Sequence, residues 1–239
     1  MLIVALVISL IFFSLGFIVT KNNAKYVMSG YNTMSELERS KVDIENLVQF
    51  FNRFHIVLGV SLFVGVFLIS RFNNNLASAF MIMYPLIGYL YMIIKSDQFY
   101  KRTSRGKLST YLGGGILAVV ICVVGYTQLF SYQSSNILLT SDKLEIEGIY
   151  GIEVKKKDIF EVKLVNKLPS ISYKSNGFAA GDYAKGSFKM EDGRIARLFV
   201  NKNGNSFLWL RTNNGEVYYN SEDLDMNELY KKIIQWRGL

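Results

Sequence analysis

Residues Thr110–Phe130 read TYLGGGILAVVICVVGYTQLF, and they lie within a longer stretch, residues 108–141, that contains no charged side chain. About 20 apolar residues are enough for a helix to cross the ~30 Å hydrocarbon core of a bilayer. The stretch therefore predicts a membrane-spanning helix. We expect it to join a membrane domain, residues 1–130, to a C-terminal domain, residues 131–239, of soluble composition.

Three further apolar runs precede this helix: Met1–Thr20, Phe54–Ser70 and Leu76–Ile94. Together they predict an all-α membrane domain of four transmembrane helices. A cleaved signal peptide is the alternative for the first run. It requires a basic N-terminal region and a small-residue cleavage site, and neither is clear here.

Basic residues separate the loops into two sides. Loops facing the cytoplasm carry an excess of lysine and arginine. Arg71 is alone between the second and third runs, whereas ten basic residues occupy the loops 21–53 and 95–109: Lys21, Lys25, Arg39, Lys41, Arg53, Lys95, Lys101, Arg102, Arg105 and Lys107. The pattern predicts that these two loops are cytoplasmic. In a bacterial cell membrane, the N-terminus and the C-terminal domain would then lie outside.

Composition argues against several classes of function. The net charge is +8, but most of the excess lies in the membrane half, and no basic module indicates nucleic-acid binding. Cys122 is the single cysteine and His55 the single histidine, so an intrachain disulfide, a zinc centre or a histidine-dependent catalytic unit is not expected. We expect no enzyme activity, no catalytic or metal-binding residue and no small-molecule cofactor.

Small residues recur along the fourth span at Gly114, Ala118, Cys122 and Gly125. Small side chains let helix backbones approach closely in membranes. The stripe predicts helix packing, either against a partner or second copy of the chain or against the other three spans.

The first loop contains a turn, SGYNT (residues 29–33), followed by Thr33 and Glu36 at the spacing of a capping box. A second helix start follows at Asp43. We expect two short surface helices, serving either as a partner's docking platform or as a structural hairpin. Over residues 1–95, the GYNT turn with Glu36, Lys41 and Asp43 resembles an uncharacterised bacterial membrane family, which implies membrane location and no assigned activity. The layout also resembles membrane immunity proteins, but Asn32 stands where those have arginine.

Beyond residue 136 the pattern changes to short β-type runs separated by turns. Strands are predicted at residues 137–140, 144–149, 152–156, 159–165, 171–174, 187–190, 195–200, 207–211 and 217–219. Asp225–Trp236 predicts a final amphipathic helix with a cap from Asp225 and Glu228. An antiparallel β-barrel or sandwich capped by this helix is expected.

The segments LTSDKLEIEGIYGIEVKKKDIFEVKLV and NGFAAGDYAKGSFKM, with the helix ending at Trp236, resemble a bacterial pleckstrin-homology-like (PH-like) domain. The resemblance implies a binding or assembly module rather than an enzyme.

Two features of this domain are candidate interaction sites. Lys155, Lys156 and Lys157 form a basic triplet that could attract anionic headgroups or teichoic-type polymers, or could be a solvated turn. Phe178 and Tyr183 lie in a predicted glycine-rich loop, residues 176–186, where they could bind a partner or pack on the barrel.

The sequence therefore predicts a non-enzymatic envelope-binding, scaffold or accessory protein that acts through its C-terminal domain. The alternative is immunity or resistance to a membrane-active peptide or toxin. The expected partners are the lipid bilayer and either a membrane protein or a second copy of the chain, but no nucleic acid.

Overall fold

The computed structural model describes residues 1–101 and 104–238, and its contacts divide the chain into two compact units, Met1–Tyr126 and Thr127–Leu239. We describe each unit by itself. In the orientation prediction, Arg102 and the side chains of Arg105 and Lys107 lie outside the described residues.

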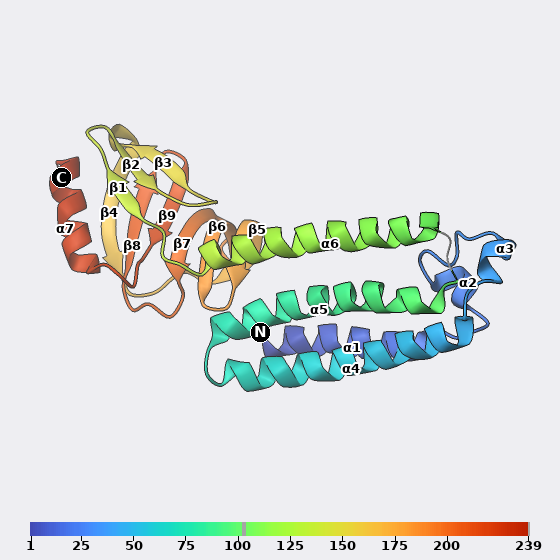
Figure 1. Ribbon diagram of the computed structural model, residues 1–239. Helices are drawn as coiled ribbons and strands as arrows, with labels where there is room; N and C mark the ends of the chain where they lie inside the picture. The colour runs from blue at the N-terminus through green and yellow to red at the C-terminus, as the bar shows by residue number, and fades with distance from the viewer. Residues whose placement is uncertain (102–103, 239) are drawn as a thin grey trace. The chain divides into compact units, whose positions relative to one another are not determined.

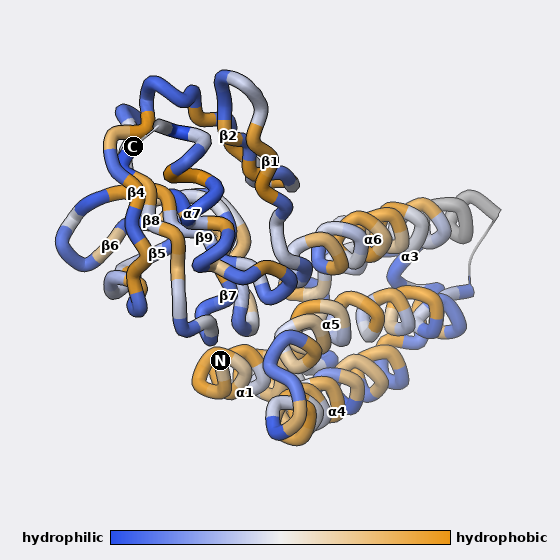
Figure 2. The backbone as a smooth tube through the Cα atoms, turned by 90° about the vertical axis from the view of Figure 1, so that its left-hand side faces the viewer, coloured by the Kyte–Doolittle hydropathy of each residue, from blue (hydrophilic) through white to orange (hydrophobic). Residues whose placement is uncertain are grey.

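The first unit is helical, with apolar residues running along its long helices (Figure 2). Its elements are α1 (Leu2–Ile18), α2 (Ala24–Val27), α3 (Glu36–Arg39), α4 (Ile44–Ser70), α5 (Asn74–Ser96), the short 3-10 helix η1 (Asp97–Phe99) and α6 (Ser104–Ser131). Among the described residues, three stretches are long and apolar enough to cross a membrane: Ile44–Ser70, Asn74–Phe99 and Thr110–Ser131. α1 is apolar but shorter, at 17 residues.

The second helix start at Asp43 is confirmed, but the expectation of a separate short helix after it is wrong. The Asp43 side chain accepts a hydrogen bond from the backbone N–H of Asn46, and α4 then runs unbroken for 27 residues. Leu47 and Val48 in its first turns are buried. The amphipathic first turns of α4 continue directly into its apolar part. The predicted surface helix and the predicted second membrane span are therefore one helix.

The capping box of the first loop lies two residues later than predicted. Ser35, rather than Thr33, caps α3: its backbone N–H donates to the Glu38 carboxylate at 2.9 Å, and its hydroxyl accepts from the Glu38 N–H at 3.4 Å. The Thr33 hydroxyl instead donates to the Gly30 carbonyl at 3.3 Å. Gly30 has φ +83°, a left-handed conformation that favours glycine.

The closest helix contact joins α1 to α4, and two glycines make it possible. A Cβ atom on Gly59 would lie 2.6 Å from the Ser9 carbonyl oxygen and 2.7 Å from the Phe13 nitrogen. One on Gly16 would lie 2.8 Å from the Asn52 carbonyl oxygen. The two backbones are therefore in contact at these points, which is the small-residue packing typical of membrane helices.

The second unit is mostly sheet and ends in a helix. Its elements are β1 (Ile137–Leu139), β2 (Lys143–Ile146), β3 (Ile152–Lys155), η2 (Lys156–Asp158), β4 (Ile159–Val165), β5 (Ile171–Ala180), β6 (Tyr183–Met190), β7 (Ile195–Asn201), β8 (Phe207–Thr212), β9 (Gly215–Tyr219) and α7 (Met226–Arg237). β1 to β3 form one sheet, and the second has the order β4-β8-β9-β7-β6-β5. The antiparallel expectation fails for one pair, because β7 and β9 run parallel.

The predicted loop at residues 176–186 is also wrong, because β5 and β6 occupy almost all of it and pair as a long hairpin. Gly177 and Gly186 face each other across this pair, where a Cβ atom on either would lie within 3.0 Å of the opposite backbone. The glycines therefore allow close strand approach rather than forming a loop.

The six-stranded sheet must curl. Its two edge strands, β4 and β5, are joined between Val165 and Ile171, a link that extends over about 20 Å. Six strands laid flat would separate the edges by about 24 Å. A cluster with Phe188, Leu198 and Phe207 is buried on one face, and Val165, Leu168 and Ile171 of the link region pack against it.

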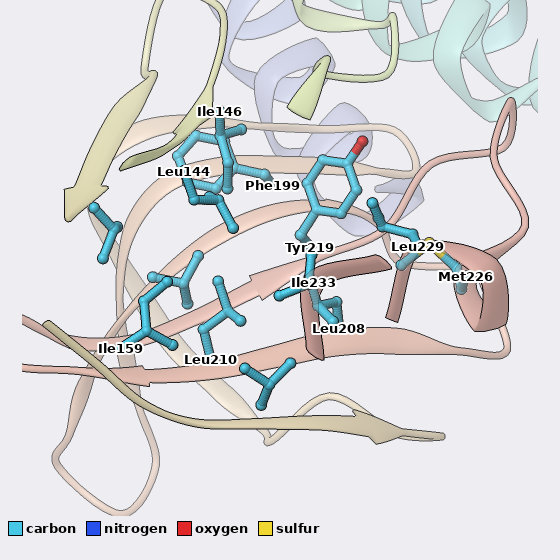
Figure 3. Close-up of a cluster of buried hydrophobic side chains, with 13 residues drawn as sticks. Leu144, Ile146, Ile159, Phe199, Leu208, Leu210, Tyr219, Met226, Leu229 and Ile233 are labelled. Carbon is cyan, nitrogen blue, oxygen red and sulfur yellow. The ribbon is translucent and has the colours of Figure 1, made fainter. Parts of the chain in front are cut away.

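The other face of the six-stranded sheet forms the main core with β2, β3 and α7 (Figure 3). Its buried members include Leu144, Ile146, Ile159, Phe199, Leu208, Leu210, Tyr219, Met226, Leu229 and Ile233. The predicted final helix is confirmed: Asp225 caps α7 by accepting from the N–H groups of Asn227 and Glu228. Its last turn is tied down by Trp236, whose indole N–H donates to the Thr140 carbonyl, and by Arg237, which donates to the Ile159 carbonyl at 3.0 Å.

Candidate functional site at the helix–sheet junction

The basic triplet lies where β3 ends and η2 begins. Lys155 and Lys157 are exposed, whereas Lys156 is half-buried with its Nζ atom 5.4 Å from the centre of the Trp236 ring. Lys156 therefore covers the end of α7, and the exposed charge of the triplet is carried by Lys155 and Lys157.

The small residues of α6 do not form a close helix contact. A Cβ atom on Gly114 would lie 3.8 Å from Leu90, and one on Gly125 would lie 3.5 Å from Met83, both ordinary van der Waals distances. Ala118 is half-buried and Cys122 is exposed. The stripe faces α5 only loosely, in contrast to Gly16 and Gly59 between α1 and α4.

The end of α6 is bound by a buried lysine of the sheet. Lys185 on β6 is 7 % exposed. Its ammonium group donates to the Phe130 carbonyl at 3.4 Å and to the Gln133 carbonyl. Carbonyl groups at a helix C-terminus carry partial negative charge and favour a cation. Burial nevertheless lowers the pKa of Lys185 to about 8.

Both predicted aromatic residues pack at this same place. The Tyr132 ring lies edge-on to Phe178, with ring centres 5.1 Å apart, and to Tyr183 at 6.4 Å. The Tyr219 hydroxyl adds a hydrogen bond to the Ser135 carbonyl at 2.7 Å. The segment that follows α6 is therefore held by side chains of β5, β6 and β9.

A polar network extends the junction. The Tyr183 hydroxyl donates to the Glu222 carboxylate at 3.2 Å, and the Asn201 amide donates to the other carboxylate oxygen. The Asn220 side chain exchanges two hydrogen bonds with the Asn201 backbone, at 2.7 and 2.9 Å. The backbone of Glu222 also contacts the segment that follows α6, because its N–H donates to the Ser134 hydroxyl at 3.4 Å.

We call the residues Tyr132, Ser134, Phe178, Tyr183, Lys185 and Glu222 the junction. The sequence analysis named Phe178 and Tyr183 as candidate residues and did not name Lys185 or Glu222. In YAKGSFKM, Lys185 alternates with Ser187 and Lys189 like any polar residue of a strand, and its partners are more than 50 positions away in the sequence, so no local signal marked it. Among the described residues, no group of three or more His, Cys, Asp or Glu side chains could hold a metal ion.

Residues 6–100 match the model of an uncharacterised family, a domain of unknown function (DUF3784). This is consistent with the resemblance to an uncharacterised membrane family. The match covers α2 to α5, η1 and most of α1. It does not extend to α6 or the sheet unit. No curated protein and no solved structure matches the chain.

Proposed function

We propose that this chain is a non-enzymatic protein of a bacterial cell membrane that serves the envelope as a binding, scaffold or accessory module through its C-terminal domain. The observation that carries this proposal is the junction. The last turn of α6 and the residues that follow it are part of the sheet domain's own packing, through Lys185, Tyr132 and Tyr219. The residues that leave α6 are thus part of the folded module and do not form a separate linker.

We infer that the domain is PH-like. A curled sheet, a second small sheet and a C-terminal helix packed on the core support this inference. The parallel pairing of β7 with β9 departs from a simple antiparallel arrangement. Binding through such a domain uses its surface, and Lys155 and Lys157 are the exposed basic side chains that we propose for it.

We further propose that α1 is a fourth span and that the C-terminal domain is outside. Seventeen helical residues cover about 25 Å, enough for a short span. The basic loops also lie at one end of the helical unit, because the Asp43 N–H donates to the Phe99 carbonyl and the Lys101 N–H to the Lys41 carbonyl. Arg71 lies in the α4–α5 connection at the other end (Figure 1).

Cysteine labelling tests this orientation. On a Cys122→Ala background, we expect Lys143→Cys to react with a membrane-impermeant maleimide in intact cells, and Lys101→Cys to react only after the cells are opened. The physical reason is the charge asymmetry of the loops. Reaction of the position 101 cysteine but not the position 143 cysteine in intact cells would show the opposite orientation.

Removal of the exposed lysines tests the binding surface. In the full chain held in lipid nanodiscs, we expect Lys155→Ser/Lys157→Ser to weaken binding of a poly(glycerol phosphate) probe by about tenfold, because each charge near a polyanion contributes on the order of 1 kcal/mol. Fluorescence anisotropy of a labelled probe measures the change.

The matched control for this measurement is Lys231→Ser/Lys232→Ser, which removes two exposed charges from α7. Equal loss in both double variants would mean that only net charge matters and that the triplet is no site. Undetectable binding by the unmodified chain would exclude this class of ligand.

A further inference from the structure

The helical unit contains a cavity of about 840 Å³. Pockets that hold small ligands commonly measure about 300–1,000 Å³. The lining comes from several separate parts of this unit: the first turns of α4, the last turns of α5, the segment between α2 and α4, residues 100–101 and the start of α6. The proposed role of the C-terminal domain does not use this cavity.

One wall of the cavity is formed by the segment before α4, and this segment is held in place by backbone hydrogen bonds. Val42 and Tyr100 form a β-bridge, and hydrogen bonds of 2.9 and 3.0 Å flank it, from Asp43 N–H to Phe99 and from Lys101 N–H to Lys41. Met28 and Tyr31 of the same segment are buried in a cluster with Leu47 and Val48 of α4. The segment is therefore fixed to α4 and to the end of α5.

The apolar part of the lining is rich in methionine and phenylalanine. Its side chains are Leu15, Val27, Met28, Met34, Val42, Leu47, Phe50, Phe51, Met92 and Ile93. Thioether side chains adapt to irregular apolar ligands. A flexible hydrocarbon chain matches this surface better than a rigid polar molecule does.

The polar groups deep in the cavity are already satisfied. His55 is 1 % exposed. Its Nδ1 atom lies 2.8 Å from the Phe51 carbonyl oxygen, and its Nε2 atom lies 3.0 Å from the Tyr89 hydroxyl. A carbonyl oxygen only accepts, so Nδ1 carries the proton and Nε2 accepts from Tyr89. Both ring nitrogen atoms of His55 therefore already have hydrogen-bond partners. An apolar chain end can lie beside His55 and Tyr89 without leaving the imidazole N–H unpaired.

The charged lining residues lie at the exposed side. Lys41, Lys101 and Glu38 line the cavity and are exposed. The Glu38 carboxylate is engaged by the N–H and hydroxyl of Ser35, which lowers the pKa of Glu38. Within the described residues, neither lysine forms a direct salt bridge, although Lys41 acts electrostatically on Glu38 and Lys101 on Asp43. Two cations at the mouth favour an anionic group there.

We propose that this cavity binds an anionic amphiphile, with its head group at Lys41 and Lys101 and its hydrocarbon chain extending toward His55 and Tyr89. Leu47 and His55, which both line the cavity, are eight residues apart on α4, a rise of about 12 Å, and Lys41 lies further out. One leaflet of the hydrocarbon core measures ~15 Å, half of the ~30 Å bilayer value. The cavity therefore has the depth of one acyl chain, and either a bilayer lipid or a free single-chain amphiphile has the required chemistry.

Native mass spectrometry of the full chain, released from nanodiscs of zwitterionic lipid, tests the proposal. Dodecyl phosphate, phosphatidylglycerol and dodecyltrimethylammonium are added separately at trace levels. We expect one retained adduct with an anionic probe and none with the cationic one. Retention of phosphatidylglycerol identifies a bilayer lipid as a source, and retention of dodecyl phosphate alone identifies a free amphiphile. Excess inorganic phosphate should not displace either.

Variants locate the site. Lys41→Gln/Lys101→Gln should reduce retention by about tenfold, while Lys21→Gln/Lys25→Gln removes two charges from the same basic segment, outside the cavity lining, and should leave retention unchanged. Met92→Trp, which fills the cavity, should abolish it. No adduct on the unmodified chain, equal loss in both double variants, or equal retention of the cationic probe would overturn the proposal. The exposed lysine pair keeps the test valid should Met92→Trp fail to fold.

Discussion

Replacing Gly59 with alanine is expected to lower the unfolding free energy of the helical unit by about 2 kcal/mol, because overpacking a close contact typically costs about 1–3 kcal/mol. The new methyl group would lie 2.6 Å from the Ser9 carbonyl oxygen and 2.7 Å from the Phe13 nitrogen. Both are backbone atoms of α1, so the helices must move apart. Reversible unfolding in mixed detergent micelles, followed by circular dichroism, measures the change.

The matched control is Gly115→Ala on α6, where a Cβ atom has no neighbour within 4 Å. Alanine is favoured over glycine in a helix by up to about 1 kcal/mol, so this variant should be unchanged or slightly more stable. If both variants lost the same stability, the α1–α4 contact would not be the close one.

We expect Lys185 to make the unfolding free energy of the sheet domain depend on pH, and this is the second large effect. Its pKa is about 8 in the folded protein, below the ordinary value of 10.5. Between these values the unfolded chain binds more protons than the folded one, so the unfolding free energy rises with pH. From pH 7 to 9.5 we expect a gain of about 2 kcal/mol, since one pKa unit corresponds to 1.36 kcal/mol. The neutral amine still donates to the carbonyl groups of the junction.

Chemical denaturation followed by tryptophan fluorescence reports on this domain, because Trp209 and Trp236 both lie in it. Lys185→Met should remove most of the rise between pH 7 and 9.5, and a smaller rise should persist because burial also lowers the pKa of Lys202; Lys189→Met, on the same strand as Lys185, should keep the full rise. Burial raises the pKa values of Tyr218 and Tyr219 to about 12, so their titration lies above this window. A rise of equal size in the Lys185→Met variant would assign it to another group.

The sequence was most informative where local chemistry decides structure. Asp43 and Asp225 were recognisable as helix caps, and both cap helices. The nine predicted strands have counterparts in the sheet unit, because alternation and turn residues act over a few positions. The capping box was misplaced by two residues because Thr33 and Ser35 both have a glutamate three positions later; in the structure the Thr33 hydroxyl donates to the Gly30 carbonyl and Ser35 caps α3.

Contacts between distant residues were not predictable in the same way. Gly16 and Gly59 lie in separate apolar runs, and nothing local shows that they face each other. The more regular stripe at Gly114, Ala118 and Cys122 was the one that the sequence pointed to, but Gly114 makes only ordinary van der Waals contact with α5. In the sequence, Lys185 resembles any other polar residue of a strand. Only the folded structure shows that its ammonium group binds carbonyl groups at the end of α6.

The order of the large sheet has a consequence for how the chain acquires its structure during synthesis. β9 lies between β7 and β8, so these two consecutive strands do not pair with each other, and β4 and β8 join the rest of the sheet only through β9. Residues 215–219 are thus needed before the two parts of the sheet can unite. The large sheet is therefore completed only after residues 215–219 have emerged. A chain that ends before residue 215 would expose unpaired strand edges, which are templates for aggregation.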